Sequence, residues 1–513
     1  MNVLIYSHTP YWIIHHAETI EIALTHISHG DSVYFLSCDG QLASCPANSF
    51  HDESICKVCR QQTEYSIDAI LQGRVVDLRL SLQSRHYLDS YFSSLKDLAE
   101  FKYCGFPFGE LVVSQIMSDV KDCFYPLETL RQRVSSLLTD AISLYEEARQ
   151  IINDKSIDKV YVWNGRRPSD GPICYAAQSQ GIGFEVYISG GKRGTYQTLR
   201  SLKFHDLSAS KECIEKLYDQ YVRIIGKKAV EEDAKIFFDN QRFGGSDAQG
   251  VIHVMGDCTE TPNLDHRSER KVVIFTSSYW EYFGMSDYKG GCYEDYYEGI
   301  RKILQDTRIC ESNNLIVRWH PYLKIAGSHE RNIINEIIRD FPDAVHYSPE
   351  SKADSYQLID IADVVITFGS TIGIEAVFYG KPSVLVGRSL YEDLECCYVP
   401  KCHEDLVKLL DGELIPLPKT GAMKFAFYSR NRGQHDFVHL NQEESNPNLF
   451  YHSGCPLRRP KPKSEFGVDS ASLDKRYHIP SYIRSRLVRL LKSLKLYSSV
   501  KKLASLMQES FFC

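Results

Sequence analysis

The sequence predicts an α/β protein of two domains, each built on a parallel sheet covered by helices, that face each other across a cleft. Apolar, β-branched runs alternate with helical patterns at 3–37 and 159–189, and again at 271–387. A stretch of small and polar residues, 243–250, separates the two halves as a linker. The chain of 513 residues is long enough for two or three domains.

The first domain is expected to span residues 1–248. It opens with a strand at 3–6, a turn, a helix and a strand at 32–37, and a second strand, helix and strand lie within 159–189. Between these units, 64–155 has apolar residues spaced by three and four and few Gly or Pro residues. That spacing predicts a helical insertion.

The second domain is expected to span residues 249–425. Strands and helices alternate along it, with strands at 271–278, 315–319, 344–348, 363–369 and 383–387. This alternation predicts a parallel, doubly wound sheet.

The remaining segment, 426–513, is expected to cross over and form a tether. Residues 441–480 are polar, charged and rich in Pro, which is typical of a poorly packed linker. Residues 482–508 then predict a basic amphipathic helix, because leucines share one face and Arg and Lys surround it. We expect this helix to contact an anionic membrane surface; the alternative is a helix packed on its own protein.

Composition narrows the class of protein. The net charge of -7 argues against a general nucleic-acid binder, which needs a basic face. The start of the chain carries no basic leader, and no stretch approaches eighteen apolar residues, so we expect a cytoplasmic protein, or one peripheral on the inner face of the cell membrane. The 16 cysteines are then expected to be reduced.

Two predicted strands of the second domain end in polar, turn-forming residues. The run LIVRWHPYL places Arg318, His320 and Pro321 at one strand end, and ITFGSTIG places Ser370 and Thr371 at another, where a helix begins. Parallel sheets bind ligands at their carboxyl edge, and the N–H groups at a helix start suit a phosphate. Ser277, Ser278 and Glu281 follow a third strand toward the same edge. The sequence therefore predicts a nucleotide-sugar site.

These motifs resemble GT-B glycosyltransferases of bacterial capsule and lipopolysaccharide assembly. The R-x-His-Pro strand end and the Gly-Ser-Thr helix start are similar to those of the capsule polysaccharide biosynthesis family, including Kdo transferases, and more distantly to bacterial sialyltransferases and teichoic-acid polymerases. The resemblance is tight over about 270–395 and loose over the first domain, where only topology and an Asn-Gly-Arg loop match.

The resemblance implies a GT-B-like fold with two Rossmann-like domains, of which the second binds the nucleotide-sugar donor. It implies that His320, Pro321, Ser370 and Thr371 hold the nucleotide phosphates, frequently those of a cytidine nucleotide. An acid on the helix after Ser370 holds the ribose in such relatives, which here indicates Glu375. Arg318 and Gly373 belong to the same donor-binding motifs.

The candidate catalytic and acceptor residues come from the first domain. An inverting transferase needs a general base for the acceptor hydroxyl, and His8, His16 and Glu18 follow the first strand. Two basic loops suit an anionic acceptor or the carboxylate of an acidic sugar. The residues expected to bind the acceptor are Asn164, Arg166, Arg167, Lys192 and Arg193.

Four cysteines lie close together after the second strand. Cys38, Cys45, Cys56 and Cys59 can supply four thiolates, and the final C-x2-C has a chelating spacing. The two interpretations are a structural zinc site and four reduced thiols near a surface loop. No cofactor is expected for catalysis itself.

The sequence thus predicts a metal-independent glycosyltransferase that moves a sugar from a CMP- or UDP-linked donor to a surface-polysaccharide or lipid-linked glycan. The lack of an Asp-x-Asp metal motif agrees with metal independence. Two alternatives remain: a sugar-nucleotide 2-epimerase of the same fold, which needs no acceptor, and a non-catalytic subunit of a polysaccharide assembly complex. The expected partners are the donor, the acceptor and the inner-membrane surface, with no nucleic acid.

Overall fold

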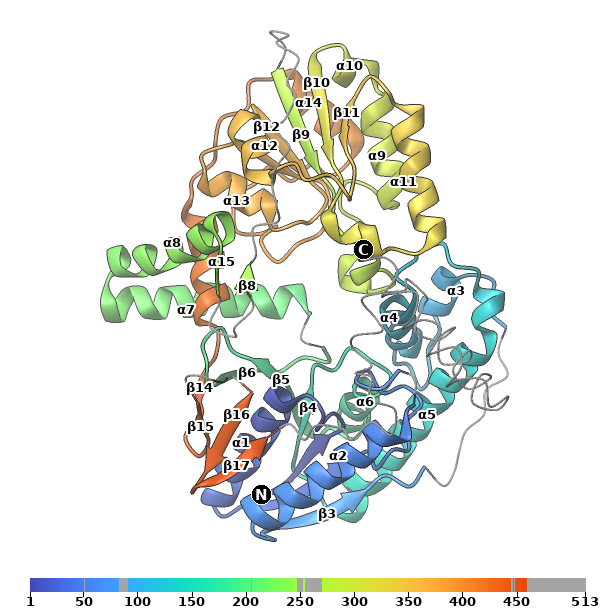
Figure 1. The fold of residues 1–513 in the computed structure, drawn as a ribbon, viewed down its shortest axis with the longest axis vertical. Helices are drawn as coiled ribbons and strands as arrows, with labels where there is room; N and C mark the ends of the chain where they lie inside the picture. The colour runs from blue at the N-terminus through green and yellow to red at the C-terminus, as the bar shows by residue number, and fades with distance from the viewer. Residues whose placement is uncertain are drawn as a thin grey trace, which may run out of the picture.

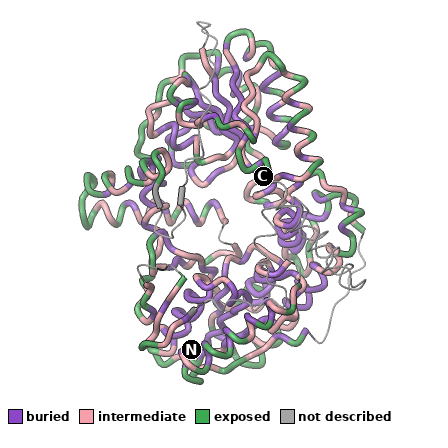
Figure 2. Tube along the Cα trace, in the orientation of Figure 1, coloured by how far each residue is buried: buried purple, intermediate pink, exposed green. Residues whose placement is uncertain are grey.

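A computed structural model describes residues 1–49, 51–82, 91–203, 205–246, 252–253, 270–443, 446 and 448–458. These residues form two lobes that lie one above the other in the view of Figure 1, each with its own sheet. Buried residues concentrate in the two sheets and in the helices that cover them (Figure 2). The expected α/β fold of two Rossmann-like domains is confirmed.

The sheet of the first lobe has the order β14-β6-β5-β4-β1-β2-β3 within the described residues. The five strands from β5 to β3 are parallel and run in the doubly wound order. At one edge, β6 is antiparallel to both of its neighbours, β5 and β14. The strands are β1 (Asn2–Ser7), β2 (Ser32–Ser37), β3 (Val75–Arg79), β4 (Lys159–Trp163), β5 (Gly183–Ser189), β6 (Thr195–Leu199) and β14 (His435–Asp436).

The helices of the first lobe cover both faces of this sheet (Figure 1). They are α1 (Ile13–Ser28), α2 (Glu53–Tyr65), α3 (Leu95–Ala99), α4 (Phe108–Val120), α5 (Arg131–Asp154) and α6 (Gly171–Ser179). The helical insertion predicted over 64–155 is present, but β3 lies inside that range, so an all-helical segment is wrong there. The run VVDLR pairs in register with β2, since a neighbouring strand satisfies its backbone and overrides the weak local pattern.

The sheet of the second lobe is entirely parallel, in the order β11-β10-β9-β12-β13. Its five strands coincide with the five predicted ones, because continuous β-branched runs are typical of strands buried on both faces. The strands are β9 (Arg270–Phe275), β10 (Asn313–Arg318), β11 (Val345–Tyr347), β12 (Val364–Thr367) and β13 (Ser383–Leu385). The helices are α9 (Tyr296–Gln305), α10 (Thr307–Cys310), α11 (Ser328–Asp340), α12 (Ser355–Ile361), α13 (Ile372–Phe378) and α14 (His403–Asp411).

Helices α7 (Leu207–Ile225) and α8 (Lys227–Phe243) form a hairpin that packs on the second lobe. Its buried side chains, Ile214, Tyr218 and Phe238 among them, share one apolar cluster with α13 and with α15 (Thr420–Asn431). The hairpin therefore belongs to the packing unit of the second lobe, although it precedes the predicted linker in the chain.

After α15 the chain returns to the first lobe. Strand β14 joins the first sheet, and a small antiparallel sheet follows, made of β15 (Asn441–Gln442), β16 (Leu449–His452) and β17 (Cys455–Arg458). Leu440, Phe450 and Leu457 are buried in the core of the first lobe. The prediction of a poorly packed tether is therefore wrong up to Arg458. The rest of the tether, the predicted basic helix 482–508 and residues 247–250 of the linker lie outside the described residues.

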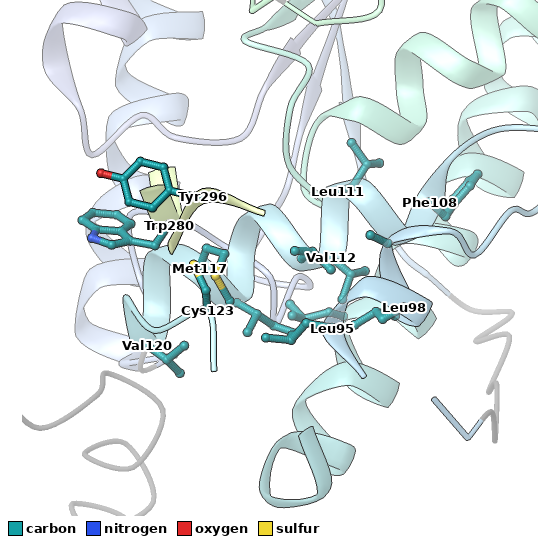
Figure 3. Packing of buried hydrophobic residues seen from close by; sticks show 14 of the residues in the cluster. Leu95, Leu98, Phe108, Leu111, Val112, Met117, Val120, Cys123, Trp280 and Tyr296 are labelled. Carbon is teal, nitrogen blue, oxygen red and sulfur yellow. The ribbon is translucent and has the colours of Figure 1, made fainter. Parts of the chain in front are cut away.

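The two lobes share one apolar cluster. Helix α4 of the first lobe packs against the 3-10 turn Tyr279–Glu281 of the second, and Figure 3 shows Met117 and Cys123 beside Trp280 and Tyr296. Within the described residues, no helix is long and apolar enough to cross a membrane.

Candidate functional site

The carboxyl edges of the two sheets face each other. Arg166 follows β4 in the first lobe, and Nη2 of its guanidinium donates to the carbonyl of Glu281, which follows β9 in the second, at 2.8 Å. Parallel sheets bind ligands at the point where the strand order reverses, which here lies beside β1 and β9. The predicted donor and catalytic segments therefore lie on opposing edges.

His320 and Ser370 flank the end of β9. The backbone N–H of His320 donates to Thr276 Oγ1 at 2.8 Å, and Ser277 Oγ donates to the carbonyl of Phe368 at 3.2 Å. Two strand spacings separate β10 from β12, so the two motifs lie about 10 Å apart at the backbone. The structure thus brings the His-Pro and Ser-Thr motifs to one edge.

The imidazole of His320 is half-buried and neutral. Burial and the nearby Arg318 lower its pKa to about 4. Its Nδ1 accepts the N–H of Tyr322 at 3.2 Å, which places the ring proton on Nε2. His320 therefore offers a neutral N–H donor to a ligand. Pro321 begins the 3-10 turn that holds this geometry.

The Ser-Thr motif is built by close backbone approaches. Gly369 has φ +103°, and a Cβ there would meet the carbonyl of Arg388 at 2.7 Å. A Cβ at Gly373 would meet Thr367 Cγ2 at 2.4 Å, so only glycine lets α13 lie against β12. Thr371 is exposed and Ser370 is half-buried at the helix start. Gly373 therefore shapes the site by packing.

Two predicted donor residues are engaged inside the protein. Arg318 donates to the carbonyls of Trp319, Ser348 and Ser351 at 2.7 to 3.1 Å. Glu375 is 3 % exposed, accepts the hydroxyl of Tyr356, and has a raised pKa because it is buried. In this structure both side chains position loops and helices of the site, and neither carboxyl nor guanidinium opens to a ribose or phosphate.

A cavity rich in tyrosine lies between the ends of β9, β12 and β13. Its volume is about 80 Å³, and Ser277, Gly369, Lys289 and Arg388 border it. Its aromatic lining comprises Tyr279, Tyr282, Tyr288, Tyr293, Tyr296 and Phe368. We predicted no cavity there from the sequence, although the Tyr-rich loop after β9 was its visible signal.

Ser278 and Glu281 pair with each other beside this cavity. Ser278 Oγ donates to Glu281 Oε2 at 2.7 Å, and burial raises the pKa of the Glu281 carboxyl. This pair fixes the loop that contacts the first lobe.

His8 of the first lobe lies at the end of β1 beside Asp170, the residue before α6. His8 Nε2 and Asp170 Oδ2 are 3.6 Å apart, and both side chains are almost fully buried. Burial lowers the pKa of His8 to about 3 and raises that of Asp170 to about 7. Asp170 was not predicted from the sequence, because a lone aspartate before a helix is usually a cap.

Several polar atoms around this pair have no hydrogen-bond partner among the described residues. They are Nδ1 and Nε2 of His8, Oδ2 of Asp170, Nε1 of Trp163, Oδ1 of Asn164 and the hydroxyls of Tyr6 and Ser169. Buried polar groups are normally paired, so a cluster of exceptions marks a site that water or a ligand completes. Asn164, at φ +63°, is the one predicted acceptor residue in this cluster.

The other predicted catalytic residues are buried in separate networks. His16 bonds to Ser66 Oγ at 2.8 Å, and burial lowers its pKa to about 3. Glu18 accepts the hydroxyl of Ser189 and pairs with His15. Each of the two side chains therefore has the partners of a structural residue, and neither is paired with His8.

The predicted acceptor cations divide into two pairs. Arg166 and Arg167 are mostly buried, and they donate to Ser114 and to Gln115 and Ser118 of α4. Lys192 and Arg193 are exposed on the turn after β5. The first pair therefore holds the lobes and α4, and the second pair alone faces solvent.

The four predicted metal ligands border one cavity of about 30 Å³. Burial raises the pKa of Cys38 to about 11 and that of Cys59 to about 12, so these thiols are protonated at neutral pH. The described residues hold no group of three His, Cys, Asp or Glu side chains placed to bind a metal. Cys38, Cys45, Cys56 and Cys59 do not supply a tetrahedral set in this arrangement, and the structural zinc stays a prediction.

A family model matches the part of the chain that forms the sheet of the second lobe. Residues 268–394 match the family model described as capsule polysaccharide biosynthesis protein, which confirms the resemblance over that range. No curated protein matches the chain.

Solved structures similar to the chain share little sequence with it. The β-Kdo 2,4-transferase KpsC of Thermosulfurimonas dismutans has 10% identity and a TM-score of 0.33, over 53% of this chain and 79% of that one. MurG of Acinetobacter baumannii has 11% identity and a TM-score of 0.27, over 85% of this chain and 97% of that one. The UDP-GlcNAc 2-epimerase of Neisseria meningitidis, bound to UDP-GlcNAc, has 10% identity and a TM-score of 0.22, over 84% of this chain and 99% of that one. TM-scores of this size do not identify a substrate.

Proposed function

We propose that this chain, whose residues 268–394 match the capsule polysaccharide biosynthesis family, is a glycosyltransferase that moves a sugar from a nucleotide-sugar donor to a glycan or lipid-linked acceptor. The observation that carries the proposal is the meeting of His320 and Ser370 at one sheet edge, on either side of β9. That edge faces the first lobe, so a donor held there lies opposite His8 and Asp170.

The donor phosphate is held by neutral groups in this proposal. His320 Nε2–H and the hydroxyls of Ser370 and Thr371 donate to phosphate oxygens, as N–H and O–H groups at a sheet edge do in nucleotide sites. Lys289 borders the adjoining cavity and offsets the charge of the leaving nucleotide, whereas Arg388, which also borders it, is paired with Glu392. No metal ion is needed for this role.

The cavity lined by tyrosines is where the transferred sugar would lie. It adjoins Ser277 and Gly369, which follow β9 and β12. Aromatic rings offer an apolar face to the C–H groups of a sugar, and the tyrosine hydroxyls offer hydrogen bonds to its hydroxyls.

Transfer then needs a proton acceptor from the first lobe. The acceptor hydroxyl gives its proton to a base, its oxygen bonds to the anomeric carbon, and the bond from that carbon to the phosphate oxygen breaks, releasing the nucleotide. Of the predicted bases, His8 is the one at the facing edge. Asp170, whose pKa is raised to about 7, is the stronger base of the two and supplies the proton-accepting carboxylate.

Calorimetry with CMP, CDP, UDP and GDP tests the donor site. We expect one nucleotide to bind, His320→Ala to weaken it about tenfold or more, and Ser370→Ala to weaken it less, because one lost hydrogen bond to a charged group is worth about 1.5–3 kcal/mol. His29→Ala, an exposed histidine after α1, is the matched control. Unchanged affinity in both site variants would remove the proposal.

A second measurement separates a transferase from other enzymes of this fold. We expect nucleotide release from a nucleotide sugar to depend on added glycan acceptor. Conversion of the nucleotide sugar without any acceptor would instead indicate a sugar-nucleotide epimerase.

A further inference from the structure

The α7–α8 hairpin projects away from both sheets. In Figure 1 it extends to the left, and the turn that joins α7 to α8 lies at its outer end. Its base is fixed to the second lobe, since Ile214, Phe238 and their neighbours are buried against α13 and α15. Figure 2 shows exposed residues at the outer end.

The outer end of the hairpin, residues 223–229, combines two exposed isoleucines with three basic residues. Ile224 is 66% exposed and Ile225 50% exposed, and every residue from Arg223 to Ala229 is exposed. Arg223, Lys227 and Lys228 flank the isoleucines on both sides of the turn. The nearest acids lie one helical turn away: Asp219 on α7, and Glu231 and Glu232 on α8, which meet the two lysines only at 3.7 and 3.9 Å. Such exposed pairs are weak, so the lysines are available to another anion.

We propose that this tip, 223–229, docks on an anionic lipid bilayer, with Ile224 and Ile225 inserted among the acyl chains and the cations against lipid phosphates. A stable protein interface buries about 800 Å² on each partner, which is more than a turn of seven residues can offer. A bilayer needs only a few apolar side chains at the interface and cations beside them. The charge and size of the tip therefore fit a membrane and not a protein partner.

The docking surface has a consequence for orientation. Helix α13, which begins beside Ser370, belongs to the same apolar cluster as the hairpin. A membrane contact at the tip would therefore fix the orientation of the second lobe at the bilayer. The inference stands without the proposed function, because it depends on the tip alone.

Co-sedimentation of the full chain with vesicles tests the proposal. We expect binding to vesicles of phosphatidylcholine and phosphatidylglycerol in equal parts, weak binding to phosphatidylcholine alone, and loss of binding as salt rises. The double variant Ile224→Ser/Ile225→Ser should bind about tenfold more weakly, and Lys227→Glu/Lys228→Glu at least as weakly, since each basic residue is worth about fivefold near such a surface. Ile415→Ser is the matched control, because Ile415 is 63% exposed elsewhere in the second lobe.

Tryptophan fluorescence at the tip reports on insertion there, whatever membrane contact another part of the chain makes. With Ile225→Trp, tryptophan emission should shift to the blue on mixing with the anionic vesicles and be quenched by lipids brominated on their acyl chains. Unchanged vesicle affinity in both double variants, or a tryptophan that stays in water, would overturn the proposal. Light scattering that shows a dimer of the wild type and a monomer of the isoleucine variant would overturn it too, since the tip would then bind a second copy.

Discussion

Asp170 and His8 show how a buried pair of titratable groups differs from an ordinary ion pair. At 3.6 Å they are too far apart for a good hydrogen bond, and both are desolvated. Asp170 Oδ1 accepts the N–H of Arg167 at 2.8 Å, but Oδ2 has no such bond among the described residues. A carboxylate kept in this state costs stability, which is a common property of functional residues.

We expect Asp170→Asn to stabilise the protein while it abolishes transfer. The folded pKa of Asp170 is about 7, above the ordinary value of 3.8, so the folded protein keeps a proton that the unfolded chain releases. The stability that the wild type has with Asp170 protonated is complete below about pH 4, and it is lost as the pH rises to about 7 and the buried carboxyl ionises. Asparagine does not titrate, so the variant should exceed the wild type by on the order of 2 kcal/mol at about pH 8, and by less at about pH 5.

Thermal unfolding at the two pH values measures this difference. Asp154→Asn, at the exposed end of α5, is the control and should change neither stability nor its pH dependence. Turnover of Asp170→Asn should fall on the order of a hundredfold or more. A variant that is less stable than the wild type at about pH 8, or fully active, would contradict this assignment.

Among the elements, α1 fixes the return of the chain to the first lobe. Glu21 is fully buried on α1, and its carboxylate accepts the backbone N–H groups of Val438, His439 and Leu440 at 2.7 to 3.2 Å. One side chain thereby satisfies three donors of a segment that has little regular structure. Leu440 then enters the apolar core of the lobe.

We expect Glu21→Gln to destabilise the protein by about 2–3 kcal/mol, because the amide replaces one acceptor oxygen with a donor that faces backbone N–H groups. Hydrogen exchange should accelerate at 438–440, and the melting temperature should fall. Glu100→Gln, on the exposed end of α3, is the control. Protection at 438–440 equal to that of the wild type would show that the carboxylate does not hold this segment.

At the scale of the whole molecule, the two lobes are joined on one side by α4. Arg166 bonds to Ser114 Oγ at 2.7 Å and to the carbonyl of Glu281 at 2.8 Å, and Lys203 lies 2.9 Å from Asp287. Cys123 donates its backbone N–H to the buried carboxyl of Glu330 on α11. These polar contacts surround the shared apolar cluster of Figure 3 and hold the two sheet edges opposite each other.

We expect Arg166→Met to loosen this contact. Methionine replaces most of the apolar part of the arginine side chain but leaves the carbonyl of Glu281 without its charged donor. The free energy of unfolding should fall by about 2 kcal/mol. Small-angle scattering should show a larger radius of gyration, and the apparent affinity for nucleotide should change little. Arg339→Met, on the exposed face of α11, is the control. A scattering curve identical to that of the wild type would mean that Arg166 does not restrain the lobes.

The sequence by itself determined the two parallel sheets and the strand ends of the second lobe. Continuous β-branched runs can be buried only as central strands, and a polar turn after such a run must reach the carboxyl edge. His320 and Ser370 were therefore predictable as neighbours. Strand β3 and the small sheet β15–β17 were not, because short runs become strands only when a neighbour pairs with them.

Only the tertiary structure decided what each polar side chain does. Arg166, Arg318 and Glu375 resemble ligand-binding residues in the sequence, yet each is engaged by groups that lie far away along the chain. Asp170 carries no local signal, because its raised pKa arises from burial and from its place beside His8. Burial and long-range contacts fix the charge and the partners of a side chain, and local sequence specifies neither.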